Sequence, residues 1–146
     1  MEVERDSIFL DTNVVLDHLA DRQPFSENAH RIFALAEFGS LELHISALSF
    51  CNLYYLLRKL QGHEVTVALL AKLAMLVQVT PVGDREVRAA LGSGFNDFED
   101  AVQLESASTM QRSGVLVSRN ARDFAGGRMQ VLSPEEYLAS RIERGI

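Results

Sequence analysis

The sequence has few of the features on which small secreted proteins and membrane proteins rely. It contains a single cysteine, Cys51, which excludes an internal disulfide. No stretch reaches the roughly 18 apolar residues of a membrane span, and the charged start, MEVERDS, lacks the apolar run of a signal peptide. The four histidines show no metal-ligand spacing, which argues against zinc. We therefore expect a protein of the reducing cytoplasm that has no contact with a membrane.

Basic residues are also few, with 14 Lys and Arg against 20 Asp and Glu and a formal net charge of −6. This balance argues against a broad basic surface for nucleic acid. It does not exclude a nuclease, because cations bound among acidic side chains reverse the local field and let a phosphate approach. The chain is 47% hydrophobic, and at its length one domain, 1–146, can form a core without disulfides.

Short apolar runs alternate with longer segments in which apolar residues recur at helical spacing. Strands are predicted at 7–10, 41–45, 77–80 and 115–118, with an edge strand at 131–132. Helices are predicted at 13–19, 26–38, 46–60, 65–76, 84–91 and 97–112, and from 134 onward. Parallel strands need such crossovers. The order therefore predicts an α/β fold, a three-layer α/β/α sandwich around a parallel sheet of four or five strands.

Acidic residues stand at the points where strands end and one helix begins. Asp11 follows the first strand, and Asp123 lies in the stretch SRNARDF after the fourth. The carboxyl ends of parallel strands share one edge of the sheet, where ligands bind. Asp97 and Asp100, three residues apart, are predicted on one face of a helix that starts at this edge, with Glu99 pointing elsewhere.

Each of these residues also has an ordinary structural explanation. Asp97 and Asp11 can cap helices, and Asp123 can stabilise its own turn with Asn120. Asp17 is expected on a solvated helix face, with a place behind the site as the alternative. Capping, however, does not require the acids to converge, and gathered carboxylates raise one another's pKa unless a cation compensates.

Hard oxygen ligands without cysteine or histidine select Mg²⁺ or Mn²⁺. Such a cation lowers the pKa of a bound water and stabilises the charge of a phosphodiester under attack. The pattern of acids therefore predicts metal-dependent phosphodiester hydrolysis.

Three passages carry a family resemblance: LDTNVVLDHL at 10–19, ISALSFCNLYYLLRK at 45–59, and DFEDAVQLESA followed by GVLVSRNARDF between 97 and 124. With them the chain resembles the PIN domain family, the ribonuclease fold of the VapC-type toxins of bacterial toxin–antitoxin pairs. The resemblance implies a Mg²⁺ or Mn²⁺ site of about four acids that cuts single-stranded RNA. It also implies an antitoxin partner and a possible homodimer, for which helices 26–38 and 46–60 offer apolar faces.

The site residues follow from this resemblance position by position. Asp11 matches the first-strand aspartate and Asp100 the aspartate at a helix start, while Asp123 and Asn120 match the turn that closes the site. Asp97 matches an additional acid of the DFEDA form. These four aspartates are the predicted catalytic and metal-binding residues, and Asn120 is a further predicted ligand.

One position departs from the family pattern. Asn52 stands where the family usually has glutamate. Its carbonyl oxygen can bind a metal or a metal-bound water, but it brings no charge, so we expect weaker cation binding or more reliance on Asp97. The residues expected to orient ligands or contact substrate are Thr12, Asn13, Ser118, Arg119 and Arg122.

Two other functions remain open at this point. One is a regulatory PIN fold whose site has lost its chemistry, for which Asn52 is the hint. The other is a phosphoaspartyl hydrolase of the haloacid dehalogenase type, which also begins from an aspartate after the first strand. That class needs a second acid two residues later, where this chain has Asn13, and a lysine that is not found near Ser118.

Overall fold

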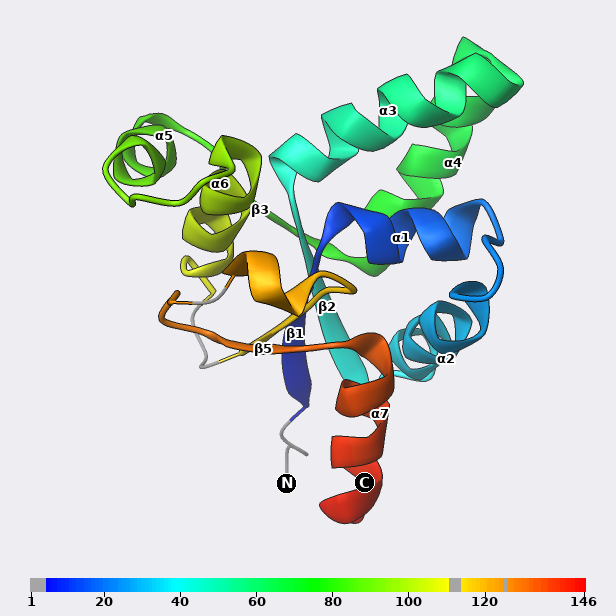
Figure 1. The fold of residues 1–146 in the computed structure, drawn as a ribbon. Helices are drawn as coiled ribbons and strands as arrows, with labels where there is room; N and C mark the ends of the chain where they lie inside the picture. The colour runs from blue at the N-terminus through cyan, green and yellow to red at the C-terminus, as the bar shows by residue number, and fades with distance from the viewer. Residues whose placement is uncertain (1–4, 111–113, 125) are drawn as a thin grey trace.

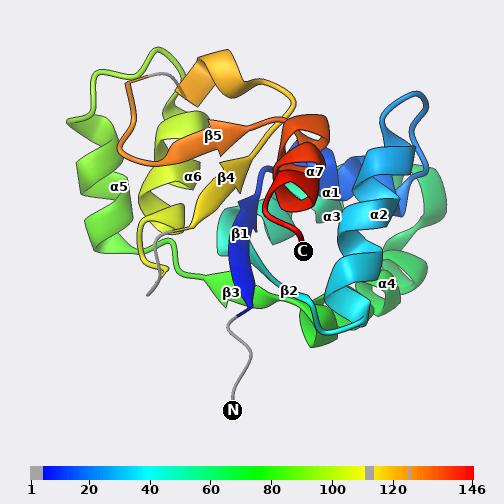
Figure 2. The same cartoon turned by 90° about the horizontal axis from the view of Figure 1, so that it is seen from below.

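A central parallel sheet organises the computed structural model, which describes residues 5–110, 114–124 and 126–146. The strand order is β3-β2-β1-β4-β5, and each neighbouring pair is parallel (Figures 1 and 2). The strands are β1 Asp6–Leu10, β2 Leu41–Ser46, β3 Gln78–Thr80, β4 Val115–Val117 and β5 Gln130–Leu132. The predicted parallel sheet is therefore confirmed, and β5 lies at an edge as expected.

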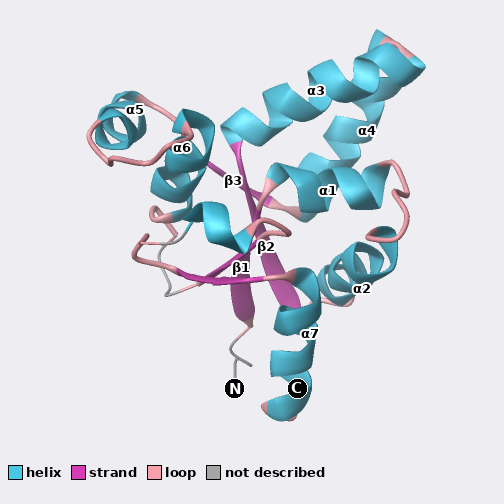
Figure 3. Cartoon of the chain, in the orientation of Figure 1, coloured by secondary structure: helices cyan, strands magenta, loops and turns pink. Residues whose placement is uncertain are grey.

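Helices connect these strands and cover both faces of the sheet (Figures 2 and 3). They are α1 Thr12–Leu19, α2 Ser26–Glu37, α3 Ala47–Gln61, α4 His63–Leu76, α5 Asp84–Leu91, α6 Phe98–Ala107, the short 3₁₀ turn η1 Ala121–Phe124, and α7 Pro134–Glu143. Figure 2 shows α5 and α6 on one side of the sheet and α2, α4 and α7 on the other. This arrangement confirms the three-layer α/β/α class. None of the helices in the described ranges has both the length and the apolar composition needed to cross a bilayer.

Strand β1 is buried on both faces, as the central strand of a parallel sheet should be. Ile8 and Leu10 belong to the larger core, which includes residues of α1, α2, α3, α4 and α7. Phe9 points to the opposite face and packs with Leu104 of α6 and Leu116 of β4. Side chains alternate along a strand, so one apolar run supplies both cores.

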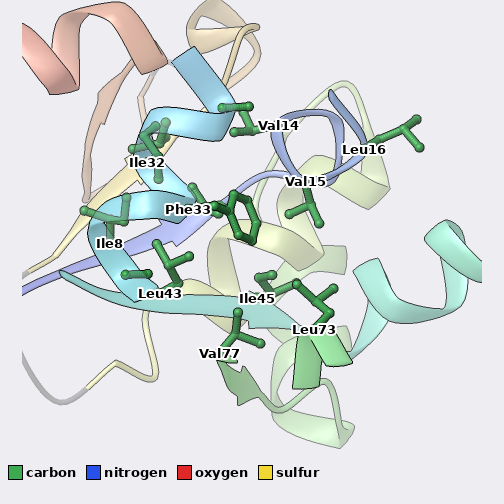
Figure 4. Packing of buried hydrophobic residues seen from close by; sticks show 14 of the residues in the cluster. Ile8, Val14, Val15, Leu16, Ile32, Phe33, Leu43, Ile45, Leu73 and Val77 are labelled. Carbon is green, nitrogen blue, oxygen red and sulfur yellow. The ribbon is translucent and has the colours of Figure 1, made fainter. Parts of the chain in front are cut away.

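The larger core fixes the helices that follow β1. Val15 of α1 and Phe33 of α2 are buried in the same cluster as Leu43 and Ile45 of β2, and Figure 4 shows them together. Because α1 begins immediately after β1, this packing leaves the residue between them, Asp11, at the carboxyl end of the sheet.

Local caps explain several of the element boundaries. The Ser46 hydroxyl accepts a hydrogen bond from the backbone N–H of Ser49 at the start of α3. Gly62 has a φ of 83°, a left-handed conformation that favours glycine, and separates α3 from α4. Ser133 and Glu136 form a capping box at the start of α7.

The helix predicted at 97–112 is shorter than expected. It ends at Ala107, and Arg112 lies outside the described residues. The hydroxyls of Ser108 and Thr109 donate to the carbonyl oxygens of Glu105 and Ser106, each at 2.7 Å. Such side-chain bonds compete with helix continuation, so the prediction from apolar spacing alone was wrong at this end.

Candidate metal and substrate site

The carboxyl ends of β1 and β4 meet beside Asp11. Its carboxylate accepts hydrogen bonds from the Ser118 hydroxyl at 2.8 Å and from the Thr12 backbone N–H at 2.8 Å. The same Ser118 hydroxyl accepts the Asn120 backbone N–H at 3.0 Å. Asp11 is buried, and burial is the main cause that raises its pKa. The structure thus joins the polar segments after β1 and β4 at one edge of the sheet.

The N-terminus of α6 brings further acids to this edge. Asp97 is the N-cap, and its carboxylate accepts the backbone N–H of Asp100 at 3.0 Å. The pKa of Asp100 is raised to about 7, first by burial and then by the negative charges of Asp97, Asp11, Asp123 and Glu99. Carboxylates from three separate segments therefore act on Asp100, and no basic side chain among the described residues offsets them.

A buried polar network fixes α6 against the strand ends. Gln103 is 1% exposed, and its amide N–H groups donate to the hydroxyls of Thr12 at 3.0 Å and Ser49 at 2.8 Å. Its carbonyl oxygen accepts the hydroxyl of Ser46. The network links the segment that follows Asp11 to α3 and α6. A glutamine inside the apolar run AVQLESA was the signal that sequence reasoning missed.

This network bears on the role expected for Thr12. The Thr12 hydroxyl lies 2.6 Å from that of Ser49, and the residue is buried. Its hydroxyl therefore contacts α3 beside Asp11, and its predicted role in orienting ligands or substrate stays a prediction. Asn13 is half-buried in the first turn of α1, and its role stays a prediction.

Glu99 lies at the site, contrary to the prediction that it points elsewhere. Its carboxylate accepts a hydrogen bond from the Asn52 side-chain amide at 2.7 Å. Burial and the charges of Asp97 and Asp11 raise the pKa of Glu99, while the bond from Asn52 lowers it. The prediction considered the faces of α6 alone. The sequence alone does not indicate that α3 places the Asn52 amide beside the first turn of α6.

Asp17 is also placed differently from its prediction on a solvated face. It is 1% exposed, with an oxygen 2.7 Å from the Arg119 Nε and another 3.7 Å from the Arg22 Nε. The Arg119 guanidinium lies 3.8 Å from the centroid of the Phe25 ring. Burial raises the pKa of Asp17, and the two arginines lower it. Arg119 is therefore held by Asp17, behind the proposed site, and its predicted phosphate contact remains a prediction.

The turn after β4 forms the exposed rim of the site. Asn120, Arg122 and Asp123 are exposed, and the Asp123 backbone N–H donates to the Asn120 carbonyl at 2.9 Å. Arg122 is thus the candidate phosphate contact on the rim that solvent reaches. The turn is closed by this backbone bond, where a side-chain bond between Asp123 and Asn120 was the expected alternative.

The candidate ligands are oxygen atoms of the kind that a hard cation prefers, although they are not arranged around a common centre. In residues 5–110, 114–124 and 126–146, no three His, Cys, Asp or Glu side chains are gathered closely enough to form a ready coordination sphere. The ligands on offer are carboxylate oxygens, with amide carbonyls at Asn52 and Asn120, and these are ligands for Mg²⁺ or Mn²⁺. The pKa of Asp100 is raised first by burial and then by neighbouring negative charges, and a bound cation would relieve the second cause.

A cavity of about 800 Å³ at the other end of the sheet provides a contrast. Asp6, one of the two acids that line it, accepts hydrogen bonds from Tyr137 at 2.8 Å and from Arg144 at 3.0 and 2.8 Å. The pKa of Asp6 is lowered, chiefly by Arg144. Arg144 lowers the pKa of Asp6 at that end, whereas every cause found among the described residues raises the pKa of Asp100.

The comparisons with known proteins agree with this architecture. A search of curated proteins gave no match. DNA-bound VapBC from Salmonella typhimurium matches at 18% identity and a TM-score of 0.65, over 88% of this chain and 98% of that one. A toxin–antitoxin complex from Klebsiella pneumoniae matches at 21% identity and a TM-score of 0.64, over 87% of this chain and 97% of that one. VapBC-1 from nontypeable Haemophilus influenzae matches at 17% identity and a TM-score of 0.64, over 88% of this chain and 98% of that one.

At these identities the solved structures establish the fold alone, and they confirm the predicted likeness to VapC-like proteins at that level. The family model described as PIN domain matches residues 7–122, which is most of the sequence. This range includes Asp11, the start of α6 and strand β4, while Asp123 in the turn after β4 lies one residue beyond it. The chain belongs to the PIN domain family.

Proposed function

We propose that the protein is a ribonuclease that uses Mg²⁺ or Mn²⁺ to hydrolyse phosphodiester bonds of single-stranded RNA. The observation that carries the proposal is the negative charge that Asp97, Asp11, Asp123 and Glu99 together exert on Asp100, at the start of α6. Membership of the PIN domain family supports the same chemistry. An unpaired strand suits the site because its flexible backbone can adapt to the acidic edge of the sheet.

The chain's own residues would hold and orient the reacting groups. Asp11, Asp97, Asp100 and Asp123 would bind one or two cations, and the carbonyl oxygen of Asn120 could add a ligand. Bound there, the metal would supply an acidified water and neutralise charge on the phosphate.

The surrounding groups set the position of these acids. Ser118 and the Thr12 N–H hold the Asp11 carboxylate, and Gln103 holds α6 in register with it. Arg122, exposed on the rim, would meet a phosphate oxygen.

The test compares RNA cleavage by the wild type and by Asp100→Asn, in Mg²⁺ or Mn²⁺, with and without a chelator. We expect Asp100→Asn to lose about 100-fold or more in rate, since changes even to residues that only support a metal ligand cost about 10–100-fold. Asp84→Asn is the matched control, because Asp84 is an exposed aspartate on α5 that pairs with Arg88. Equal cleavage in all reactions would refute the proposal.

We further propose that the protein is the toxin of a type II toxin–antitoxin pair in the cytoplasm. The similar solved structures are described as VapBC or toxin–antitoxin complexes, which supports an antitoxin partner. Induced expression of the wild type should arrest bacterial growth, and expression of Asp100→Asn should not. A short open reading frame just upstream should encode a protein that binds the chain and restores growth. Sedimentation would show whether the chain also forms a homodimer.

A regulatory PIN domain without catalysis is the second candidate. It is favoured by the neutral side chain of Asn52 and by the lack of a ready coordination sphere within the described part of the chain. Calorimetric titration with Mn²⁺ separates the two functions. Saturable binding supports the nuclease, whereas no binding supports the regulator.

A further inference from the structure

The contact between Asn52 and Glu99 joins two helices that are distant in sequence. Asn52 lies on α3 and Glu99 in the first turn of α6, and the amide N–H of Asn52 donates to a Glu99 carboxylate oxygen at 2.7 Å. Only the amide nitrogen can donate to a carboxylate, so the chemistry fixes the orientation of the Asn52 side chain. A hydrogen bond to a charged acceptor is among the stronger side-chain contacts.

The direction of Glu99 is unusual for a first-turn glutamate. Such a residue gains from the helix dipole while its carboxylate remains in water. Glu99 is exposed, but its carboxylate turns toward α3 and accepts the Asn52 amide while it stays in the same turn as Asp97 and Asp100. Moving a carboxylate toward like charges is unfavourable, so another interaction must offset the repulsion.

Asn52 supplies part of this compensation in a particular way. Its amide gives Glu99 a hydrogen bond but no positive charge, so the carboxylate keeps its full attraction for a cation. An arginine or lysine at position 52 would neutralise Glu99, and an acid would repel it. Asparagine is therefore suited to hold a carboxylate in place without cancelling its charge.

We infer that Glu99 is a member of the metal-binding set and that Asn52 is the positioning residue that holds it there. The pair supplies, from the first turn of α6, the carboxylate that position 52 itself lacks. This inference rests on the proposed function, because it assigns a residue to the same cation site.

The first experiment measures Mn²⁺ affinity by calorimetry for the wild type, Glu99→Gln and Asn52→Ala, with circular dichroism to verify folding. We expect Glu99→Gln to weaken binding about 10–100-fold, and Asn52→Ala to weaken it by a smaller factor because the carboxylate remains. Glu27→Gln is the matched control, since Glu27 is an exposed glutamate in the first turn of α2. It should bind Mn²⁺ as the wild type does.

The second experiment moves the carboxylate from one helix to the other. The double variant Asn52→Glu with Glu99→Gln keeps the net charge and an amide–carboxylate pair, but places the acid on α3. We expect its Mn²⁺ affinity to recover to within about 10-fold of the wild type, and its RNA cleavage to exceed that of Glu99→Gln alone. If the double variant binds Mn²⁺ as weakly as Glu99→Gln does, the inference that a carboxylate at either position serves the same cation site is refuted.

The outcomes separate this inference from the function on which it rests. Saturable wild-type binding that Glu99→Gln leaves unchanged refutes the role of Glu99 and leaves the ribonuclease proposal standing. A wild type that shows no saturable Mn²⁺ binding overturns both.

Discussion

Replacing Asp100 with asparagine should stabilise the metal-free protein while it removes the proposed activity. The pKa of Asp100 is raised from 3.8 to about 7 by burial and by neighbouring acids. The folded state therefore binds the Asp100 proton more tightly than the unfolded state does. Stability from this group is fully present below the unfolded pKa and is lost as pH rises toward about 7. Asparagine, which does not ionise, avoids this loss.

The size of the effect follows from the shift and from the exposure of the group. One pKa unit corresponds to about 1.4 kcal/mol, so the full shift would give roughly 4 kcal/mol for a completely buried carboxyl. Asp100 is only half-buried, and screening by solvent reduces this to about 1–2 kcal/mol. The variant also loses the attraction between a first-turn carboxylate and the helix dipole, which reduces this gain by about 0.3–1 kcal/mol. We expect Asp100→Asn to be more stable by about 1 kcal/mol at pH 7.5.

Urea unfolding in the presence of a chelator, at pH 4.5, 5.5, 6.5 and 7.5, measures this difference. The gain of Asp100→Asn should grow across the series, whereas Asp84→Asn, on an exposed pair, should show no such growth. Saturating Mn²⁺ should reverse the order, because only the wild type binds it tightly. A variant that is less stable at pH 7.5 than the wild type, or a gap independent of pH, would refute the reasoning.

Three further predictions concern Gln103, Arg119 and His18. Gln103→Leu should lower the free energy of unfolding by about 2–4 kcal/mol in urea, because buried hydroxyls lose their partner. Arg119→Met should cost about 2–4 kcal/mol in the same assay, since buried Asp17 loses its nearest cation, and an unchanged stability would contradict the ion pair. The pKa of His18 is lowered to about 4 by burial and by His30, so the stability that His18 contributes should be lost as pH drops from 6.5 toward 4. His18→Gln should show a shallower fall in urea unfolding over that range.

The fold was predictable because it depends on patterns that are local in the sequence. The run Ile8–Leu10 indicates a strand buried on both faces, and the alternation of strands and helices requires a parallel sheet. The end of α6 was not predictable from apolar spacing, because Ser108 and Thr109 use hydroxyls to bond the last carbonyls. Local hydrogen bonding decided that boundary.

The site was predictable only in part, for a related physical reason. The meeting of Asp11 with the turn after β4 follows from strand direction, which the sequence indicates. The pairs Asn52–Glu99 and Asp17–Arg119 join residues 47 and 102 positions apart, across helices whose rotation depends on core packing. A helical face considered by itself gives the wrong direction for Glu99 and the wrong exposure for Asp17. Contacts between elements therefore had to come from the structure.

The capping and metal-binding explanations of Asp97 are compatible, and one pair of variants separates them. The cap uses one carboxylate oxygen, which accepts the Asp100 N–H at 3.0 Å, and a carboxylate has about four acceptor positions. Asparagine caps helices as well as aspartate does, so Asp97→Asn should unfold near the wild-type urea midpoint, while Asp97→Ala should lose about 1 kcal/mol. Both variants remove the charge and should bind Mn²⁺ more weakly in calorimetry. Wild-type Mn²⁺ affinity in Asp97→Asn would leave capping as the only role of Asp97, because a neutral amide can replace a cap but not a charged ligand.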